Sequence, residues 1–296
     1  MKKTTGFLQL MRPANIVTSI ADVLAGIAIS GFVAGSDFLP DNISPVILLC
    51  ISTIGLYGGG VVFNDVFDAG LDKLERPERP IPKGMVSIRE AAFLGTVLLL
   101  TGVVAAAIVS GISGLLALSI AFAALIYNKW SKHHTIAGPL NMGLCRGLNL
   151  LLGISIVAAA IPEWWFIAIV PIIYIAAITM ISRGEVHGGS KSTLYFAGFL
   201  YLMVIASILL LSDIMGMFRW ALIFLLPFAW MIFSALIKAI RIPAPQNIGK
   251  AVKAGVIALV LMNAAWAAAF GVIGLAFVIV LLLPLSLWLS KIFAVT

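Results

Sequence analysis

The chain has 296 residues, of which 62% are hydrophobic and 10% are charged, and its mean hydropathy is +1.14. Charged residues make up about a quarter of a typical soluble domain, so this composition excludes a soluble globule and predicts a polytopic helical membrane protein. The net charge of +7 does not indicate nucleic-acid binding, because the cations lie in short loops rather than in a stripe with aromatic partners.

The first apolar stretch, about residues 14–34, is long enough to cross a bilayer. We expect a retained membrane helix, because no convincing signal-peptide cleavage site accompanies it. Asn15 and Asp22 lie along one face of this helix. Carboxylates inside a membrane are costly and tend to face a cavity, so Asp22 is a candidate functional residue. The alternative for Asp22 is a structural role, in which it caps a neighbouring polar group.

The second apolar stretch, about residues 45–64, runs into the densest cluster of charge in the chain. Asn64, Asp68 and Asp72 follow one another at intervals of four residues, so a continuing helix is expected to place them along one face. Their oxygens suit Mg²⁺, which takes one or two carboxylates and completes its shell with water and substrate phosphates. The sequence therefore predicts a magnesium site with these three residues as ligands.

Positive charge follows at once in the same segment. Arg76, Arg79 and Lys83 are interspersed with prolines, which end the helix and hold the cations on a stiff, extended segment. Guanidinium groups bind phosphate oxygens bidentately, so these residues are candidate ligands of a diphosphate. The alternative is a solvated connector, which is what most mixed-charge loops between membrane helices are.

The order of these residues is specific. Asn-Asp-x-x-Asp-x-x-x-Asp followed by Arg-Pro-x-Arg-Pro-Ile-Pro-x-Gly, from Asn64 to Gly84, resembles the first signature of the UbiA superfamily of intramembrane prenyltransferases. The resemblance extends more loosely from Leu10 to about Asn263, and residues 183–188 are most similar to the EboC-like branch. It implies one integral-membrane domain over residues 1–296, with Mg²⁺ as cofactor. In this family the polar face of the first helix, with Asn15 and Asp22, borders the active cavity.

Two further stretches, about residues 90–110 and 112–128, are expected to form a tight hairpin. In the loop that follows, the family often has Tyr-x-x-x-Lys, whose hydroxyl and ammonium help to bind the diphosphate. Tyr127 matches this pattern, whereas Lys132 stands one position late. The adjacent pair His133-His134 is expected to be solvated, because neighbouring residues on a helix do not face together as metal ligands must.

The fifth stretch, about residues 137–160, contains Arg146 and Asn149. A cation so deep in a membrane-spanning segment needs a partner, which is either Asp22 or a substrate anion. Both a structural ion pair and a role in the substrate cavity remain open for Arg146. Cys50 and Cys145 lie in apolar stretches and are expected to be packing residues rather than disulfide partners or thiolate metal ligands.

The sixth stretch, about residues 163–182, ends where the family carries its second aspartate signature. The resemblance makes Glu185 the counterpart of the second aspartate and a fourth metal ligand, with His187 as a further candidate. Ile181 occupies the place of the first aspartate. Arg183 and Lys191 are expected to grip the diphosphate directly and to replace part of the missing charge. One or two Mg²⁺ ions are both compatible with this pattern.

Four more apolar stretches follow, at about residues 192–212, 219–238, 251–270 and 272–290. The fold class predicted is an all-α bundle of nine or ten transmembrane helices around a central cavity that opens to the cytosolic face. With the N-terminus inside, nearly all Lys and Arg residues fall on the inner side of the membrane. We expect a multi-pass protein of the bacterial inner membrane whose two charged loops face the cytosol.

The function predicted is that of a Mg²⁺-dependent intramembrane prenyltransferase, which moves a polyprenyl group from a prenyl diphosphate to an unknown acceptor and releases diphosphate. Asp68, Asp72 and Glu185 are the expected catalytic residues. Glu185 and Asp22 are both candidates to take up the proton that the acceptor loses. The predicted residues of the cavity and acceptor site are Asn15, Asp22, Arg146 and Asn149.

Three alternatives belong to other classes of protein. A membrane protein that binds a prenyl lipid without transferring it would explain the weakened second motif. A transporter would also bury Asp22 and Arg146, but it would be expected to show repeat symmetry and helix breaks at the midplane. A CDP-alcohol phosphatidyltransferase also uses intramembrane Asp and Mg²⁺, but its signature, Asp-Gly-x-x-Ala-Arg, is absent from the sequence.

Overall fold

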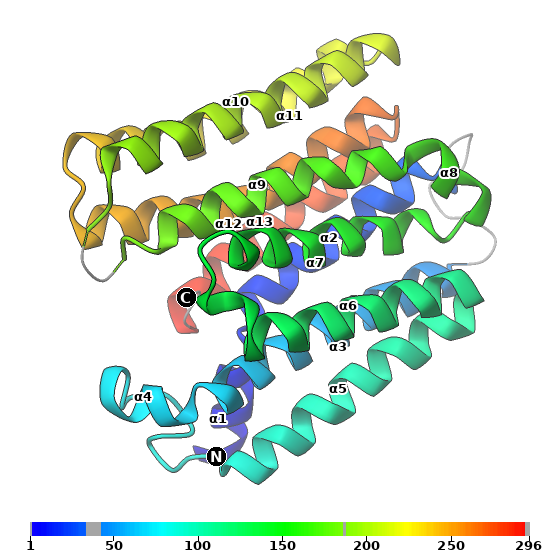
Figure 1. The fold of residues 1–296 in the computed structure, drawn as a ribbon. Helices are drawn as coiled ribbons and strands as arrows, with labels where there is room; N and C mark the ends of the chain where they lie inside the picture. Colours follow the sequence, from blue (N-terminus) through cyan, green and yellow to red (C-terminus); the bar gives the residue numbers. More distant parts are fainter. Residues whose placement is uncertain (1, 34–42, 186–187, 294–296) are drawn as a thin grey trace.

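The computed structural model describes residues 2–33, 43–185 and 188–293, and within them the chain forms a bundle of long helices (Figure 1). Each of the ten apolar stretches predicted from the sequence contains most or all of an α-helix, so the all-α fold class is confirmed. The elements are α1 (Lys2–Met11), α2 (Pro13–Ile29), α3 (Ser44–Phe67), α4 (Ala69–Glu75), α5 (Ile88–Val109), α6 (Gly111–Lys129), η1 (Ser131–His133), α7 (Ala137–Ile154), η2 (Ala158–Ala160), α8 (Ile161–Trp164), η3 (Trp165–Ala168), α9 (Ile169–Ser182), α10 (Lys191–Ile214), α11 (Phe218–Arg241), α12 (Pro245–Ala269) and α13 (Ile273–Ile292).

The described residues contain eight helical segments that are long and apolar enough to span a membrane on their own. The pair α1 and α2, bent by 41° where they meet, would make a ninth span. Helix α7 is not among the eight, although it lies in the bundle, because polar residues such as Arg146 interrupt its apolar sequence. Gly271, whose positive φ of 77° suits glycine, separates α12 from α13, so these two helices do not form one long span.

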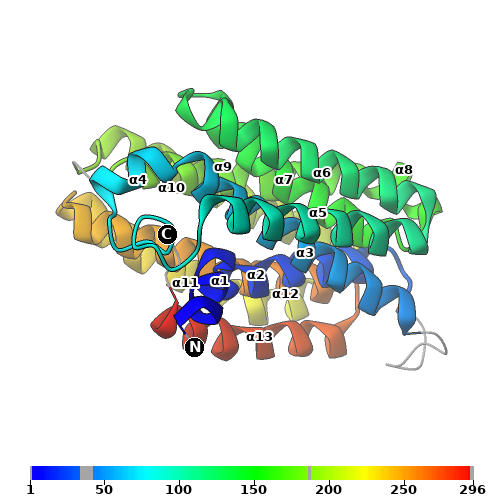
Figure 2. The same cartoon turned by 90° about the horizontal axis from the view of Figure 1, so that it is seen from below.

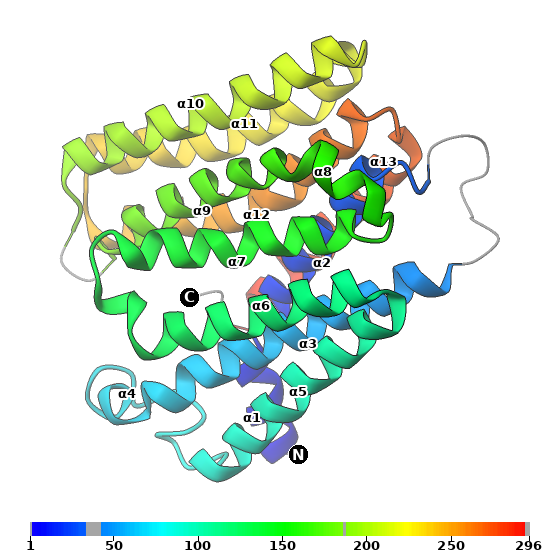
Figure 3. The same cartoon turned by 45° about the vertical axis from the view of Figure 1, so that its right-hand side comes forward.

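Helix α12 lies at the centre of the bundle. It packs against α2, α9, α11 and α13, and 83% of its most apolar window is buried. Figures 1 and 3 show α3, α5 and α6 on one side of this centre and α10 and α11 on the other, with α2, α7 and α9 between them. The outer helices expose large apolar side chains such as Phe93 and Trp230, as expected for surfaces that face lipid.

Glycines allow the inner helices to approach closely. A Cβ atom on Gly26 of α2 would lie 2.2 Å from the carbonyl oxygen of Leu150, and one on Gly153 of α7 would lie 2.2 Å from that of Val23. The glycines at the end of α3 act in the same way, since a Cβ on Gly59 would lie 2.9 Å from the carbonyl oxygen of Gly95 on α5. Small residues of this kind are typical of helix contacts in membranes, where close packing replaces the hydrophobic effect.

The charged segments gather at one end of the bundle. Helix α4, the turn between α6 and α7, and the connection from α9 to α10 lie at the same end in Figures 1 and 3. Figure 2 shows α4 and α8 at opposite ends. This arrangement places both motif loops on one side, as the distribution of Lys and Arg predicts.

Candidate active site

The first motif lies on a helix that continues almost unbroken from α3 into α4. Asp68 stands between the two helices with φ −88° and ψ 1°. Its backbone N–H donates to the carbonyl oxygen of Asn64 at 3.0 Å, and its own carbonyl oxygen accepts from the N–H of Asp72 at 2.8 Å. The helical hydrogen bonds therefore continue from α3 into α4. The number of residues between two motif positions then gives the angle between their side chains around the helix axis.

Asn64 and Asp68 face α6 and the turn η1 behind it. The Lys132 ammonium forms an ion pair with Oδ1 of Asp68. Asn128 donates from Nδ2 to the carbonyl oxygen of Gly60 at 2.7 Å, and its Oδ1 accepts from Nδ2 of Asn64 at 3.1 Å. Because Asn64 donates from its amide nitrogen, its Oδ1 keeps its capacity to accept, one helical turn before Asp68.

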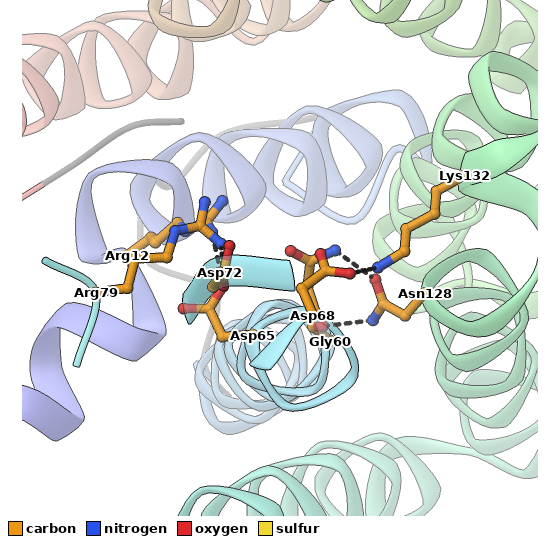
Figure 4. Close-up of polar contacts among 9 residues, drawn as sticks. Arg12, Gly60, Asp65, Asp68, Asp72, Arg79, Asn128 and Lys132 are labelled. Atoms are coloured by element: carbon orange, nitrogen blue, oxygen red, sulfur yellow. Dashed lines mark hydrogen bonds and ion pairs between the residues drawn. The ribbon is translucent and has the colours of Figure 1, made fainter. Parts of the chain in front are cut away.

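Asp65 and Asp72 occupy a different face of the same helix (Figure 4). Oδ1 of Asp65 accepts from Nη2 of Arg12 at 2.9 Å and from Nη1 of Arg79 at 3.1 Å. The same Nη1 of Arg79 donates to Oδ2 of Asp72 at 2.9 Å. The expectation that Asn64, Asp68 and Asp72 form one column is therefore wrong, since Asp68 and Asp72 contact different cations.

The angular step of a helix explains this division. At about 100° per residue, Asn64 and Asp72 differ by about 80° around the axis, whereas Asp65 and Asp72, seven residues apart, differ by only about 20°. The interval of seven residues is visible in the sequence, and it places Asp65 and Asp72 on nearly the same side of the helix, two turns apart. The roles of Asp65 and Arg12 were missed because only the intervals of four were followed.

The second charged loop faces the first through Arg76 and Glu185. Glu185 is half-buried, and burial raises the pKa of its carboxyl above the ordinary value, while the charge of Arg76 acts in the opposite direction. Arg183 donates from Nη2 to the carbonyl oxygen of His134 at 2.7 Å, which ties this loop to the turn after α6. Tyr127, near the end of α6, lies within electrostatic range of both Asp68 and Arg183.

Some of the predicted site residues have no contact with this cluster. Lys83 and Lys191 are exposed, and neither ammonium group forms a hydrogen bond or an ion pair with any residue in the described ranges. His187 lies outside the described residues. Ile181 is buried. The His133 and His134 side chains are exposed, as predicted for a solvated pair.

The predicted residues of the fifth span form a separate, buried network. Arg146 donates from Nη1 to Oδ2 of Asp22 at 2.7 Å and from Nη2 to Oγ1 of Thr18 at 2.8 Å, and it lies over the ring of Tyr57. The Asp22 side chain is only 1% exposed and also accepts from Nδ2 of both Asn149 and Asn263.

The predicted ion pair between Asp22 and Arg146 is therefore present. Since every oxygen of Asp22 has a partner, this network holds α2, α7 and α12 together. The neighbouring Asn15 is also buried on α2. Thr18, Thr53 and Asn263 complete the polar contacts and were missed, because single polar residues in apolar helices carry no spacing signal.

The donor set of the first motif fits Mg²⁺. In the part of the chain that the structure describes, no three His, Cys, Asp or Glu residues lie close enough together to hold a metal ion by themselves. Asp68 is 20% exposed, and Asn64 stands one helical turn before it. Mg²⁺ commonly takes one or two carboxylates and fills its other positions with water and phosphate oxygens, so these hard oxygens suit a shared protein and substrate site.

Comparison with known proteins identifies the family. Residues 23–259 match the model of the UbiA prenyltransferase family. The digeranylgeranylglyceryl phosphate synthase of Methanothrix thermoacetophila is 30% identical over 214 residues, which cover 69% of this chain and 76% of that protein. The protein of the same name from Ignicoccus hospitalis is 30% identical over 191 residues, 63% of this chain, but the match spans only 59% of its own length.

A solved structure has the same fold. The UbiA homolog from Archaeoglobus fulgidus, bound to DMAPP and Mg²⁺, aligns with a TM-score of 0.56 at 18% identity and covers 90% of this chain and 99% of that one. The predicted prenyltransferase family is thereby confirmed, and the transporter and phosphatidyltransferase alternatives are set aside. The family match and the helical bundle together show that this chain is a multi-pass membrane protein of the UbiA prenyltransferase family.

Proposed function

We propose that this protein transfers a polyprenyl group from a prenyl diphosphate to a lipid-like acceptor at the end of the bundle that carries α4. The observation that carries this proposal is Asp68, a partly exposed carboxylate with Asn64 beside it and Lys132 against it. In the proposed site Asn64 and Asp68 would hold Mg²⁺, and the bound ion would supply positive charge for the leaving diphosphate. Arg79 and Lys132 bind diphosphate oxygens, and Arg76, Tyr127 and Arg183 line the opposite side.

The reaction breaks the allylic C–O bond of the donor, and the pair of electrons leaves with the diphosphate. The acceptor then bonds to the carbon and loses a proton. We assign this proton to Glu185 rather than to Asp22, because Asp22 is enclosed by Arg146 and two asparagines. Glu185 lies in the charged loop, and its raised pKa makes it a better proton acceptor than an ordinary carboxylate.

The acceptor and the orientation belong to the proposal as well. The archaeal relatives are named for a product that carries geranylgeranyl groups on glyceryl phosphate. We therefore propose geranylgeranyl diphosphate as the first donor to test and a glyceryl phosphate lipid as the first acceptor. The excess of Lys and Arg at the α4 end supports a site that opens to the cytosol. The predictions of a bacterial inner membrane and of the EboC-like branch stay predictions.

The test is the release of diphosphate from geranylgeranyl diphosphate by the purified protein in lipid nanodiscs, with Mg²⁺ and a panel of acceptors. Asp68→Ala is expected to abolish release. The matched control is Asp213→Asn, which removes an exposed acidic residue of α10 outside the motif loops and is expected to keep full activity. If the wild type binds the donor but releases no diphosphate with any acceptor, the protein is a prenyl-lipid-binding member of the family instead.

A further inference from the structure

We propose that Asp65 is a positioning residue, which fixes Arg79 for the diphosphate of the donor and does not hold the metal ion. Arg12 in turn holds Asp65. The inference rests on the proposed function, because it names a further residue of the same site. It concerns the side of the motif helix that contacts Arg12 and Arg79, about 60° around the helix axis from Asp68 (Figure 4).

Two carboxylates, those of Asp65 and Asp72, hold the Arg79 guanidinium through one of its nitrogens, Nη1. Nη1 carries two hydrogens, and it donates to Oδ1 of Asp65 at 3.1 Å and to Oδ2 of Asp72 at 2.9 Å. A guanidinium has five N–H groups in a planar fork, so three of them, on Nη2 and Nε, remain for another anion. The Arg79 side chain is 12% exposed. Two carboxylates thus set the plane in which Arg79 presents its remaining donors.

Arg12 holds Asp65 through an unusual backbone. Arg12 has φ 48° and ψ 67°, a left-handed conformation that costs free energy for any residue other than glycine. It stands at the 41° bend between α1 and α2, where Pro13 begins the second helix. From this bend Nη2 of Arg12 reaches Oδ1 of Asp65 at 2.9 Å, the same oxygen that Arg79 contacts. The ion pair between Arg12 and Asp65 therefore offsets part of the free-energy cost of the left-handed backbone at Arg12.

Charge distinguishes Asp65 from Asp68. Asp65 and Asp72 are matched by two guanidinium groups, and the side chain of Asp65 is only 5% exposed. Asp68 is 20% exposed and meets the single, flexible ammonium of Lys132. A divalent cation that displaced both arginines from Asp65 would take from the largely buried Arg12 its carboxylate partner and leave Arg79 with Asp72 alone, which is costly. A cation that displaces Lys132 from Asp68 only moves an ammonium toward the diphosphate.

The test uses donor binding rather than turnover. In nanodiscs, the affinity for geranylgeranyl diphosphate is measured at saturating Mg²⁺, and the Mg²⁺ concentration at half-maximal binding is measured separately. Asp65→Asn, which keeps a hydrogen-bond acceptor but removes the charge, is expected to weaken donor binding about tenfold and to leave the Mg²⁺ midpoint unchanged. Asp68→Asn is expected to raise the Mg²⁺ midpoint by at least about tenfold.

A double-mutant cycle shows through which residue Asp65 acts. In an Arg79→Gln background, Asp65→Asn is expected to cause no further loss of donor affinity, because the guanidinium that it positions is gone. Losses that add in full, or a rise of the Mg²⁺ midpoint in Asp65→Asn equal to that in Asp68→Asn, would overturn the inference.

Two measurements keep the result independent of folding and of the proposed function. If Asp65→Asn does not fold, Asp65→Glu, which keeps the charge but displaces it, is expected to weaken donor binding at an unchanged Mg²⁺ midpoint, and a raised midpoint would contradict the inference. If Asp68→Asn also leaves the Mg²⁺ dependence of binding unchanged, the proposed function fails instead, because that residue carries the proposed magnesium site.

Discussion

Lys132 pairs with Asp68 although it stands one position after the place where the family pattern has its lysine. The short turn η1 after α6 explains this, since it turns the chain back over the end of α3 and brings the ammonium to the motif. A sequence pattern counts positions along one helix, whereas the long side chain of a lysine in a turn reaches the same point from a neighbouring position.

Lys132→Met is expected to have effects of opposite sign on the two ligands. Without the ammonium, Asp68 has no competing cation, so Mg²⁺ alone is expected to bind about fivefold more tightly. The affinity for prenyl diphosphate is expected to fall about tenfold, because a phosphate contact is lost. Isothermal titration of each ligand checks both values. Lys129→Met removes a cation that lies 4.5 Å from the centroid of the Trp130 ring and should change neither. Weaker Mg²⁺ binding in Lys132→Met would contradict this account.

Glu185 predicts a pH dependence of stability. Its pKa is raised by burial, so the folded state binds this proton more tightly than the unfolded state, and the stabilisation is lost as the pH rises through the raised pKa. Glu185→Gln is therefore expected to unfold at the wild-type temperature near pH 4 and at a higher temperature than the wild type near pH 7, since an ordinary Glu has a pKa of about 4.3. Thermal unfolding in nanodiscs measures this difference.

A control variant tests whether the pH dependence of unfolding comes from Glu185. Glu163→Gln removes an exposed carboxylate of α8, at the other end of the bundle, and is expected to leave the pH profile of unfolding unchanged. A midpoint of Glu185→Gln below that of the wild type at neutral pH would mean that Arg76 stabilises the Glu185 carboxylate by more than burial destabilises it.

At the scale of elements, the sequence predicts the helices well but predicts their contacts only in part. Hydropathy marks the long helices, because a helix in lipid must satisfy its own backbone groups, although α7 is too polar to be marked as a span by itself. The ion pair between Asp22 and Arg146 is also predictable, since a charge in a membrane needs a partner. The pairing of Arg12 with Asp65 is not, because it depends on the bend between α1 and α2 and on how α1 packs against α3.

Helix α2 packs against α7 at two glycines, and this contact predicts a strong effect of a single methyl group. Gly153→Ala would place its Cβ 2.2 Å from the backbone carbonyl oxygen of Val23, so the two helices must separate. We expect a loss of about 1–3 kcal/mol in the free energy of unfolding. Reversible denaturation in mixed micelles gives this value.

The matched control for this contact is Gly111→Ala at the start of α6, where a Cβ would meet no atom within 4 Å. This change is expected to be neutral or to stabilise by up to about 1 kcal/mol, because alanine restricts the unfolded chain. An equal loss in both variants would show that the close approach of α2 and α7 does not limit stability.

At the scale of the whole molecule, the network around Asp22 lies inside the bundle, where it joins α2 and α7 to the central α12. Arg146→Met leaves the buried carboxylate of Asp22 without its cation, and we expect a loss of about 3–5 kcal/mol in the free energy of unfolding. Adding Asp22→Asn to Arg146→Met is expected to recover part of the loss, because the unpaired buried charge is gone. Asn149 and Asn263 donate to different oxygens of Asp22, so the amide oxygen accepts from only one of them.

The same double variant separates structure from chemistry. Because Asp22 and Arg146 are assigned here to the framework, the double variant is expected to keep its affinity for prenyl diphosphate once it is folded. A stable double variant that no longer binds the donor would place Asp22 and Arg146 in the substrate cavity, the other role that the sequence allows for them.

The central claim is that one helix divides its carboxylates, with Asp68 for the metal and Asp65 for the arginines. The most direct test is a crystal structure with Mn²⁺ and a prenyl diphosphate, in which anomalous scattering locates the ion. We predict an anomalous peak about 2.1–2.2 Å from a carboxylate oxygen of Asp68, with Asp65 still bound to Arg12 and Arg79. A peak coordinated by Asp65, with either arginine displaced, would contradict the account.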